Sequence, residues 1–359
     1  MSSSPHLTWK NLPAAALQQK PDLVREWDRL NAARGDLPFL SAEALITALD
    51  IFGDGRERLL VGQQAHATVA MFLLVPLGKF RWSTFQPSQI PLGAWVAEAG
   101  LAPDDIARSL SRGPLGFCLS LSVTQLDSRF TPRGEDASDS QTADYIETGW
   151  IDLTGNFEEY WSARGKNLRQ NMRKQRNKLA AEGITGRMRT LTRCEEIAPA
   201  IERYGELESS GWKAAKGTAI HRDNAQGRFY GHLLEAAAKR GQAVVYEYLF
   251  DDRVVASNLC LQRNGTLVVL KTTYDDSIQS YSPAFLLCQD EMEQLYREKV
   301  IDRLEYYGRL MDWHTKWTAN KRAIYHLTVY RWPLVKQLAE WRRLHMSQPS
   351  IKEGHATST

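Results

Sequence analysis

The segment "DWHTKW" (residues 312–317) contains the densest group of side chains able to move a proton. Asp312 and His314 flank Trp313. A carboxylate that fixes the tautomer of an imidazole is a common way to prepare a general base. Because residues two positions apart do not face each other on a helix, contact between Asp312 and His314 requires a loop or a strand. The alternative is a structural histidine.

The segment "SYSPAFLL" (residues 280–287) reads as a helix start that can receive an anion. Ser280 and Ser282 offer hydroxyl groups, and Pro283 suits the first helical position because no hydrogen-bond donor is lost there. The free N–H groups of the first turn and the positive end of the helix dipole attract phosphate. An ordinary Ser-Pro helix start is the alternative.

Residues 160–183, "YWSARGKNLRQNMRKQRNKLAAEG", contain seven Lys and Arg residues in a helical pattern. Trp161, Leu168, Met172 and Leu179 fall on one narrow stripe, which predicts that one side of this helix packs inward. The basic residues occupy the remaining circumference and form no single face for reading nucleic-acid bases.

Arg169 and Arg173 lie one helical turn apart in this segment and are candidates for holding a phosphate of a donor or an anionic acceptor. The alternative is a solvated helix face. The chain has 45 basic and 42 acidic residues and a net charge of +3, so any anion-binding patch must be local.

Helical and strand patterns alternate along the 359 residues, which predicts an α/β fold of α+β type. A helix capped by Ser41 is expected to share Leu45, Ile46 and Leu49 on one face. The Asn264-Gly265 pair is a strong hairpin signal. Strands are predicted at 58–63, 67–78, 115–123, 145–154, 186–193, 242–250, 253–263, 265–275, 300–308 and 322–331. Further helices are predicted at 103–113, 194–213, 224–241 and 283–299 and around Trp341.

The length favours two domains, and the polar segment 127–144 is the best candidate for a boundary. We expect an N-terminal arm (1–36), an N-terminal lobe (37–128), a linker (129–144), a C-terminal lobe (145–345) and a disordered tail (346–359).

The order of motifs resembles that of the GNAT acyltransferases, in particular the CelD-like and FemAB-like branch. The motifs are "LPFLSAEAL", "FLLVPL", the basic helix, "SSGWKAAKGTAI", "RFYGHLLEAAAKRGQAVVYEYLFDDRVVASNLCL", "TTYDDSIQSYSPAFLL" and "YYGRLMDWHTKWT". The resemblance covers nearly the whole chain. It implies two tandem GNAT-like lobes, each a mixed, mostly antiparallel sheet flanked by helices.

The resemblance also implies transfer of an acyl group from acetyl-CoA or another acyl-CoA, without a metal, to an amine or hydroxyl of a small molecule or glycan precursor. Residues 280–285 (Ser280, Ser282, Pro283, Ala284 and Phe285) would then receive the coenzyme. However, the Gly-rich loop of the family is absent, and Ala284 replaces a frequent Gly. Tyr274, or its neighbour Tyr281, would protonate the leaving thiolate, unless Tyr274 only packs in the core or rim.

The same resemblance assigns substrate contacts to Trp212 and Lys213, which match a Trp-Lys pair of the family, and to Lys316, which matches a recurrent Lys. Gly308 would permit a tight backbone turn. A core Trp212 with an exposed Lys213 is equally compatible with the sequence, and Lys316 would then only cover the aromatic surface of Trp317.

Two other functions remain open. FemAB-like relatives use aminoacyl-tRNA as donor, but this sequence lacks a long helical arm, so tRNA is less expected than an acyl-carrier protein. A degenerate GNAT-like binding module without activity is the other.

The cysteines are widely spaced and indicate neither a zinc site nor disulfides. No apolar run approaches the roughly 18 residues of a membrane span, and we expect a cytoplasmic protein.

Overall fold

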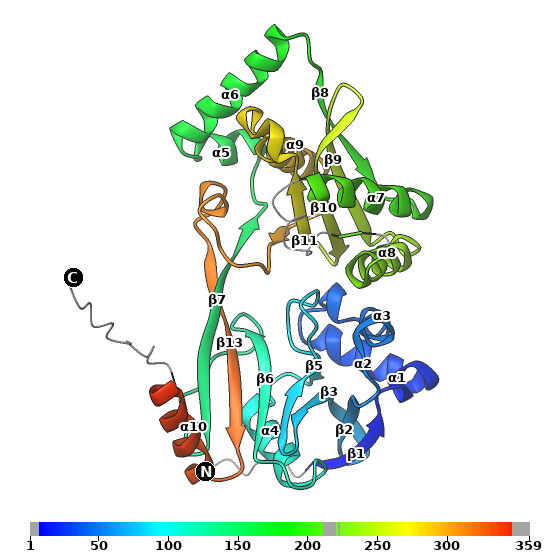
Figure 1. Cartoon of the computed structure of the whole chain (residues 1–359), viewed down its shortest axis with the longest axis vertical. Helices are drawn as coiled ribbons and strands as arrows, with labels where there is room; N and C mark the ends of the chain where they lie inside the picture. Colours follow the sequence, from blue (N-terminus) through cyan, green and yellow to red (C-terminus); the bar gives the residue numbers. More distant parts are fainter. Residues whose placement is uncertain (1–6, 211–219, 222, 347–359) are drawn as a thin grey trace, which may run out of the picture.

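The computed structural model describes residues 7–210, 220–221 and 223–346. A single 13-stranded mixed sheet runs through both lobes in the order β1-β2-β3-β4-β6-β13-β7-β12-β11-β10-β9-β8, with β5 paired to β3. Figure 1 shows β7 and β13 crossing from one lobe to the other side by side. The fold is therefore the expected α/β type with two lobes.

The strands of the N-terminal lobe are β1 (Thr8–Pro13), β2 (Arg58–Gln64), β3 (Ala67–Gly78), β4 (Arg81–Thr84), β5 (Trp95–Ala97) and β6 (Ser120–Asp127). The crossing strands are β7 (Ser140–Asp152) and β13 (Lys321–Tyr330). Those of the C-terminal lobe are β8 (Gly186–Leu191), β9 (Ala243–Phe250), β10 (Arg253–Arg263), β11 (Thr266–Tyr274) and β12 (Arg303–Glu305).

The helices of the first half are α1 (Ala16–Gln19), α2 (Pro21–Ala33), η1 (Pro38–Leu40), α3 (Ala42–Phe52) and α4 (Pro103–Arg112). Those of the second half are α5 (Phe157–Ser162), α6 (Lys166–Ala181), α7 (Cys194–Ser210), α8 (Ala225–Ala238), η3 (Asp276–Tyr281), α9 (Pro283–Glu298), η4 (His314–Lys316) and α10 (Pro333–Met346). The 3-10 segments η1, η3 and η4 are short.

Several local predictions are confirmed. The Ser41 side chain accepts a hydrogen bond from the N–H of Ala44 and caps α3. The β10–β11 hairpin turns at Asn264 and Gly265, whose φ angles are +46° and +71°. Two positive φ values in succession are what a type I′ turn requires, which is why this dipeptide signals a hairpin.

The N-terminal segment is not a loose arm, in contrast to the prediction. It contains β1, α1 and α2, and the side chains of Leu17, Trp27 and Leu30 are fully buried. Pro21 starts α2, and the indole N–H of Trp27 donates to the carbonyl of Leu40 at 2.8 Å. Burial of these large apolar groups offsets the entropy of ordering the segment.

The predicted lobe boundaries also differ from the structure. Strand β7 begins at Ser140, inside the expected linker, and β13 lies between β6 and β7 although it follows the C-terminal lobe in sequence. Val329 and Leu327 of β13 are buried against the N-terminal lobe. The last strand thus completes the first lobe. The expected tail from 347 onward lies outside the described residues.

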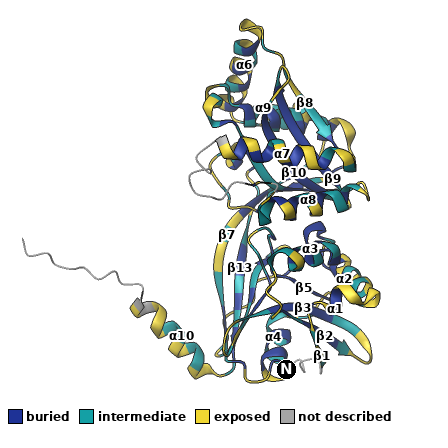
Figure 2. Ribbon diagram, turned by 45° about the vertical axis from the view of Figure 1, so that its right-hand side comes forward, coloured by how far each residue is buried: buried dark blue, intermediate teal, exposed yellow. Residues whose placement is uncertain are grey.

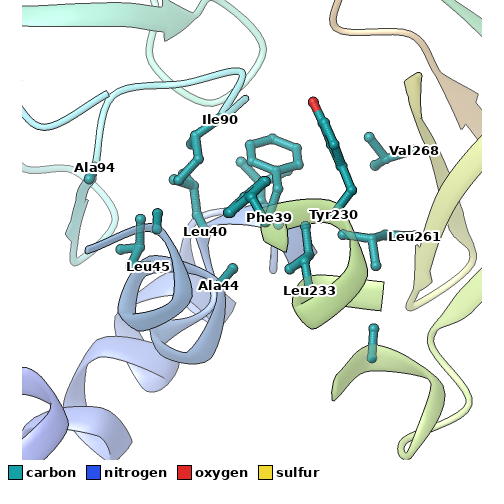
Figure 3. Packing of buried hydrophobic residues seen from close by; sticks show 14 of the residues in the cluster. Phe39, Leu40, Ala44, Leu45, Ile90, Ala94, Tyr230, Leu233, Leu261 and Val268 are labelled. Carbon is teal, nitrogen blue, oxygen red and sulfur yellow. The ribbon is translucent and has the colours of Figure 1, made fainter. Parts of the chain in front are cut away.

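The two lobes share a hydrophobic core. Figure 3 shows Phe39 and Ala44 of the N-terminal lobe on the side of Tyr230 and Leu233 of α8. A buried ion-pair network adds to this contact. Arg322 of β13 donates to both carboxylate oxygens of Asp127 (2.7 and 2.8 Å) and to Glu305 of β12 (2.8 Å), which ties the lobes together.

Helices cover both faces of the C-terminal sheet. Val245 and Leu261 pack with α7 and α8, whereas their neighbours Val244 and Cys260 pack with α9. The alternation of side chains along a strand therefore separates two helical layers. Figure 2 shows buried residues concentrated in the strands, while α10 displays mainly exposed and intermediate residues.

The basic segment forms two helices instead of one. α5 ends at Ser162, and α6 begins after Gly165. Leu168, Met172 and Leu179 of α6 are buried, as the stripe predicted.

Candidate active site

Strands β11 and β12 separate and open the sheet of the C-terminal lobe. They pair in parallel only from Thr266–Val268 to Arg303–Glu305. Beyond Val268, β11 continues to Tyr274, whereas the chain after β12 hydrogen-bonds to Gly149 of β7. Val269–Tyr274 therefore has no strand partner on this side within the described chain. Free backbone N–H groups at such an edge are available to a ligand.

A cavity of about 300 Å³ occupies this opening. Its walls come from the end of β11, the start of α9, the end of α7 and two tryptophans. The lining residues are Leu207, Glu208, Thr272, Thr273, Tyr274, Asp276, Gln279, Ser282, Pro283, Ala284, Phe285, Cys288, Trp313 and Trp317. Because α7 and α9 cover opposite faces of the sheet, the cavity reaches from one face to the other.

Glu208 lines the cavity on the α7 side. The residue is only 1% exposed, and its carboxylate accepts hydrogen bonds from the N–H of Ile220 (2.8 Å) and the hydroxyl of Tyr204 (3.3 Å). Lys271 Nζ lies 4.0 Å from Glu208 Oε1. A buried, oriented carboxylate at a cavity wall is suited to receiving a proton or binding an ammonium group. The sequence prediction missed this residue.

Tyr274 lines the same cavity and packs with the α9 side of the sheet. Burial and the neighbouring Asp276 carboxylate raise the pKa of its hydroxyl above the ordinary value. The hydroxyl therefore keeps its proton at neutral pH and can donate it.

The start of α9 combines three features suited to an anion. Ser282 has left-handed backbone angles (φ +54°, ψ +49°), and Pro283 occupies the first helical turn. Within the described residues, the N–H of Ala284 has no hydrogen-bond acceptor. The Nζ of Lys316 lies 5.1 Å from the ring centre of Phe285, so a cation stands beside the helix start. Ser280 is exposed and does not line the cavity.

One face of helix α6 contacts the residues just before the start of α9. Asn171 donates to the hydroxyl of Ser282 at 3.3 Å, and the Nζ of Lys178 lies 3.6 Å above the ring of Tyr281. At about 100° per residue, Lys174 lies about 60° around the helix from Asn171 and about 40° from Lys178, on the same side of α6.

Arg169 and Arg173 point away from that face. Each lies about 160° around α6 from Asn171. Arg169 Nε donates to the carbonyl of Arg164, and both side chains are exposed. The predicted pair is therefore remote from the start of α9, because the buried stripe fixes how the helix is rotated.

The predicted pair of Asp312 and His314 does not form a contact in the structure. Asp312 is exposed, whereas His314 is buried and its Nδ1 accepts a hydrogen bond from the N–H of Met311 at 2.9 Å. Burial lowers the pKa of His314 to about 4, so the ring is neutral at pH 7. Its ring stacks on Trp313, with 3.6 Å between centroids. His314 thus contacts a cavity wall and does not line the cavity itself.

The other predicted substrate contacts are scattered. Gly308 is exposed, and the positive φ of the turn belongs to Tyr307 instead. Trp212 and Lys213 lie outside the described residues. Trp317 is not among the predicted site residues, yet it is 1% exposed, lines the cavity, and its carbonyl accepts hydrogen bonds from Tyr160 (2.9 Å) and Arg164.

A second buried carboxylate lies beneath the cavity. Glu291 of α9 is 2% exposed, and its Oε2 accepts a hydrogen bond from Asn258 at 2.7 Å, while Oε1 has no hydrogen-bond partner among the described residues. Burial raises the pKa of Glu291 to about 7. A small void beside Glu291 shares Thr272, Cys288 and Trp313 with the main cavity. The spacing of the apolar residues in α9 did not predict that Glu291 lies buried beside the cavity.

Within the described ranges, no group of three or more potential ligands could hold a metal ion. No helix in the same part of the chain is long and apolar enough to cross a membrane.

Comparison with known proteins agrees with this geometry. Residues 166–315 match the sequence profile of the acetyltransferase (GNAT) domain family. No curated protein matches the sequence.

Solved structures with low sequence identity share the fold. The C-terminal domain of a putative lysylphosphatidylglycerol synthetase from Agrobacterium fabrum superposes with a TM-score of 0.52 at 12% identity, covering 91% of this chain and 98% of that one. A conserved protein of unknown function from Bacteroides thetaiotaomicron gives 0.54 at 10% identity, covering 90% and 100%.

The profile match defines the class of the matched part of this protein, which is an acyltransferase domain. More particularly, the C-terminal lobe, with the opening between β11 and β12, is a GNAT-type acetyltransferase domain.

Proposed function

We propose that the protein transfers an acyl group from an acyl-CoA thioester to an amine or hydroxyl of a small molecule or glycan precursor. One observation carries this proposal: a single cavity passes through the sheet between β11 and β12 and has Glu208 on the α7 side and Tyr274 on the α9 side. A reaction that joins two substrates needs such access from both faces.

The α9 side suits the donor. The free N–H of Ala284, the hydroxyl of Ser282 and the positive end of the α9 dipole would receive the pyrophosphate, as the family resemblance implies. Lys178 and Lys316 add positive charge beside it. When bound, the coenzyme supplies an activated thioester carbonyl. Those backbone N–H groups of Val269–Tyr274 that point away from β10 could stabilise charge on that carbonyl oxygen.

The α7 side suits the acceptor. The Glu208 carboxylate accepts the proton that an amine or hydroxyl loses as it attacks. Tyr274 donates its phenolic proton to the leaving group at the other side of the opening. The hydrogen bonds from Ile220 and Tyr204 hold Glu208 in place, so little reorganisation is required.

His314 takes a positioning role in this proposal. Its neutral ring supports Trp313, which forms the cavity wall. The variant His314→Asn, which keeps an acceptor for the N–H of Met311, should retain most of kcat, and Asp312→Asn should retain all of it. A loss of kcat of about 10²-fold or more in His314→Asn, without a change in melting temperature, would indicate instead that His314 is the general base.

The direct test of function is thiol release from acetyl-CoA in the presence of a panel of amino sugars and small amines. Acceptor-dependent release supports the proposal. If no acyl-CoA reacts or binds while an aminoacyl-tRNA serves as donor, the FemAB-like alternative is correct and the proposal fails. The exposed cations of α6, including Arg169 and Arg173, would then contact RNA phosphates.

A further inference from the structure

Among the residues that the structure describes, Arg34 is a buried cation without a carboxylate partner. It follows α2, is 7% exposed, and forms no ion pair within the described part of the chain. One terminal nitrogen donates to the carbonyl of Trp95 at 2.7 Å, and the other donates to the hydroxyl of Thr131 at 3.3 Å. Nε is buried and has no hydrogen-bond partner in the described structure. Asp127, the carboxylate that acts on Arg34 electrostatically, is engaged by Arg322.

A cavity of about 470 Å³ in the N-terminal lobe lies against this guanidinium. Its apolar walls are Trp95, Leu101, Phe130, Tyr325 and Leu327. The guanidinium carbon lies 3.6 Å from the ring centre of Trp95, which fixes the plane of the cation. This cavity shares no residue with the one between β11 and β12.

Three acidic residues also line the N-terminal cavity. Glu98 pairs with Arg29, and Asp104 pairs with Arg108 at 2.8 Å. Glu135 is exposed and forms no ion pair among the described residues. These carboxylates repel a second negative charge, so the cavity disfavours phosphates and polyanions.

We propose that the N-terminal lobe binds a small monocarboxylate with an aromatic or aliphatic body, with the carboxylate on Arg34. A buried guanidinium with unused donors is costly, and a planar carboxylate satisfies it better than any other common anion. The apolar walls would cover the body of the ligand, since transfer of apolar surface out of water is favourable. The proposal is independent of the acyl-transfer site.

Calorimetric titration of the full-length protein tests this assignment with three probes that share one ring. Benzoate should bind, whereas benzyl alcohol, which lacks the charge, and phenyl phosphate, which carries more, should bind at least about tenfold more weakly. Absence of benzoate binding at millimolar concentration, or equal affinity for benzyl alcohol, overturns the proposal.

Two variants locate the binding. Arg34→Lys keeps the charge and loses the planar fork, and it should weaken benzoate binding about tenfold or more. Ala99→Trp places a bulky ring at an exposed position on the cavity wall and should block benzoate without affecting the core. If Arg34→Lys does not fold, the Ala99→Trp result decides. Unchanged benzoate affinity in the folded variants places the ligand elsewhere and refutes the site.

Discussion

Glu208 of α7 and Tyr274 of β11 line one cavity although their elements belong to packing layers on opposite faces of the sheet. The two residues are 66 positions apart in sequence, and the separation of β11 from β12 brings them to the same opening. A proton acceptor on one side and a proton donor on the other is the arrangement that acyl transfer between two bound substrates requires.

Tyr274→Phe should lower kcat about 10²-fold with acetyl-CoA as donor, because the leaving thiolate loses its proton source. Donor affinity and melting temperature should remain near those of the wild type. Tyr281→Phe is the matched control, since the Tyr281 hydroxyl donates to Glu182 at 2.7 Å outside the cavity. Equal losses in both variants, measured by thiol release, would argue against a specific role for Tyr274.

Glu208→Gln should lower kcat/KM for the acceptor about 10²-fold, while donor binding stays unchanged. Glutamine keeps an oxygen that can accept from the N–H of Ile220, so the fold should be preserved. The deficit should shrink as the pH approaches the pKa of the amine acceptor, because the amine then needs no base. A deficit that is independent of pH would indicate a binding role instead.

Paired charge removals on α6 test which face meets the donor. Lys174→Ala with Lys178→Ala should raise the Kd for coenzyme A about tenfold, because these cations lie on the face that contacts Ser282 and Tyr281. Arg169→Ala with Arg173→Ala removes the same charge from the opposite face and should have little effect. The reverse result would favour the original assignment of Arg169 and Arg173 to phosphate binding.

Glu291 should make stability depend on pH. Its pKa is about 7 in the folded protein and 4.5 ordinarily, so the folded state binds the proton more tightly. The stabilisation is complete below about pH 4.5 and is lost as pH rises through 7, which corresponds to about 3 kcal/mol. Glu291→Gln should therefore be more stable than the wild type at pH 8 and similar at pH 4.5. Urea unfolding at both values measures this, and an unchanged difference contradicts it.

The sequence predicted the structure correctly where neighbouring residues determine it. Capping by Ser41, the Asn264-Gly265 turn and the Pro283 helix start are fixed by neighbouring residues, and all three were predictable. The sequence did not predict the structure where pairing between distant strands determines it. Nothing near β13 indicates that this strand completes the N-terminal lobe.

The candidate site likewise contains residues that the sequence predicts and residues that only tertiary packing brings to the cavity. The cavity wall at residues 282–285 follows from a motif, and Tyr274 follows from the end of a strand. Glu208 lies inside an ordinary helical pattern, and only tertiary packing brings it to the opening. Asp312 and His314 were paired on sequence proximity, but the short η4 turn buries one and exposes the other.

The most direct test is calorimetric titration of coenzyme A into the wild type and into Thr272→Trp. Thr272 lines both the main cavity and the void beside Glu291, so an indole at this position fills the opening. The account predicts a saturable heat for the wild type and none for a folded Thr272→Trp variant. Coenzyme A binding that survives this substitution, or its absence from the wild type, would contradict a donor site between β11 and β12.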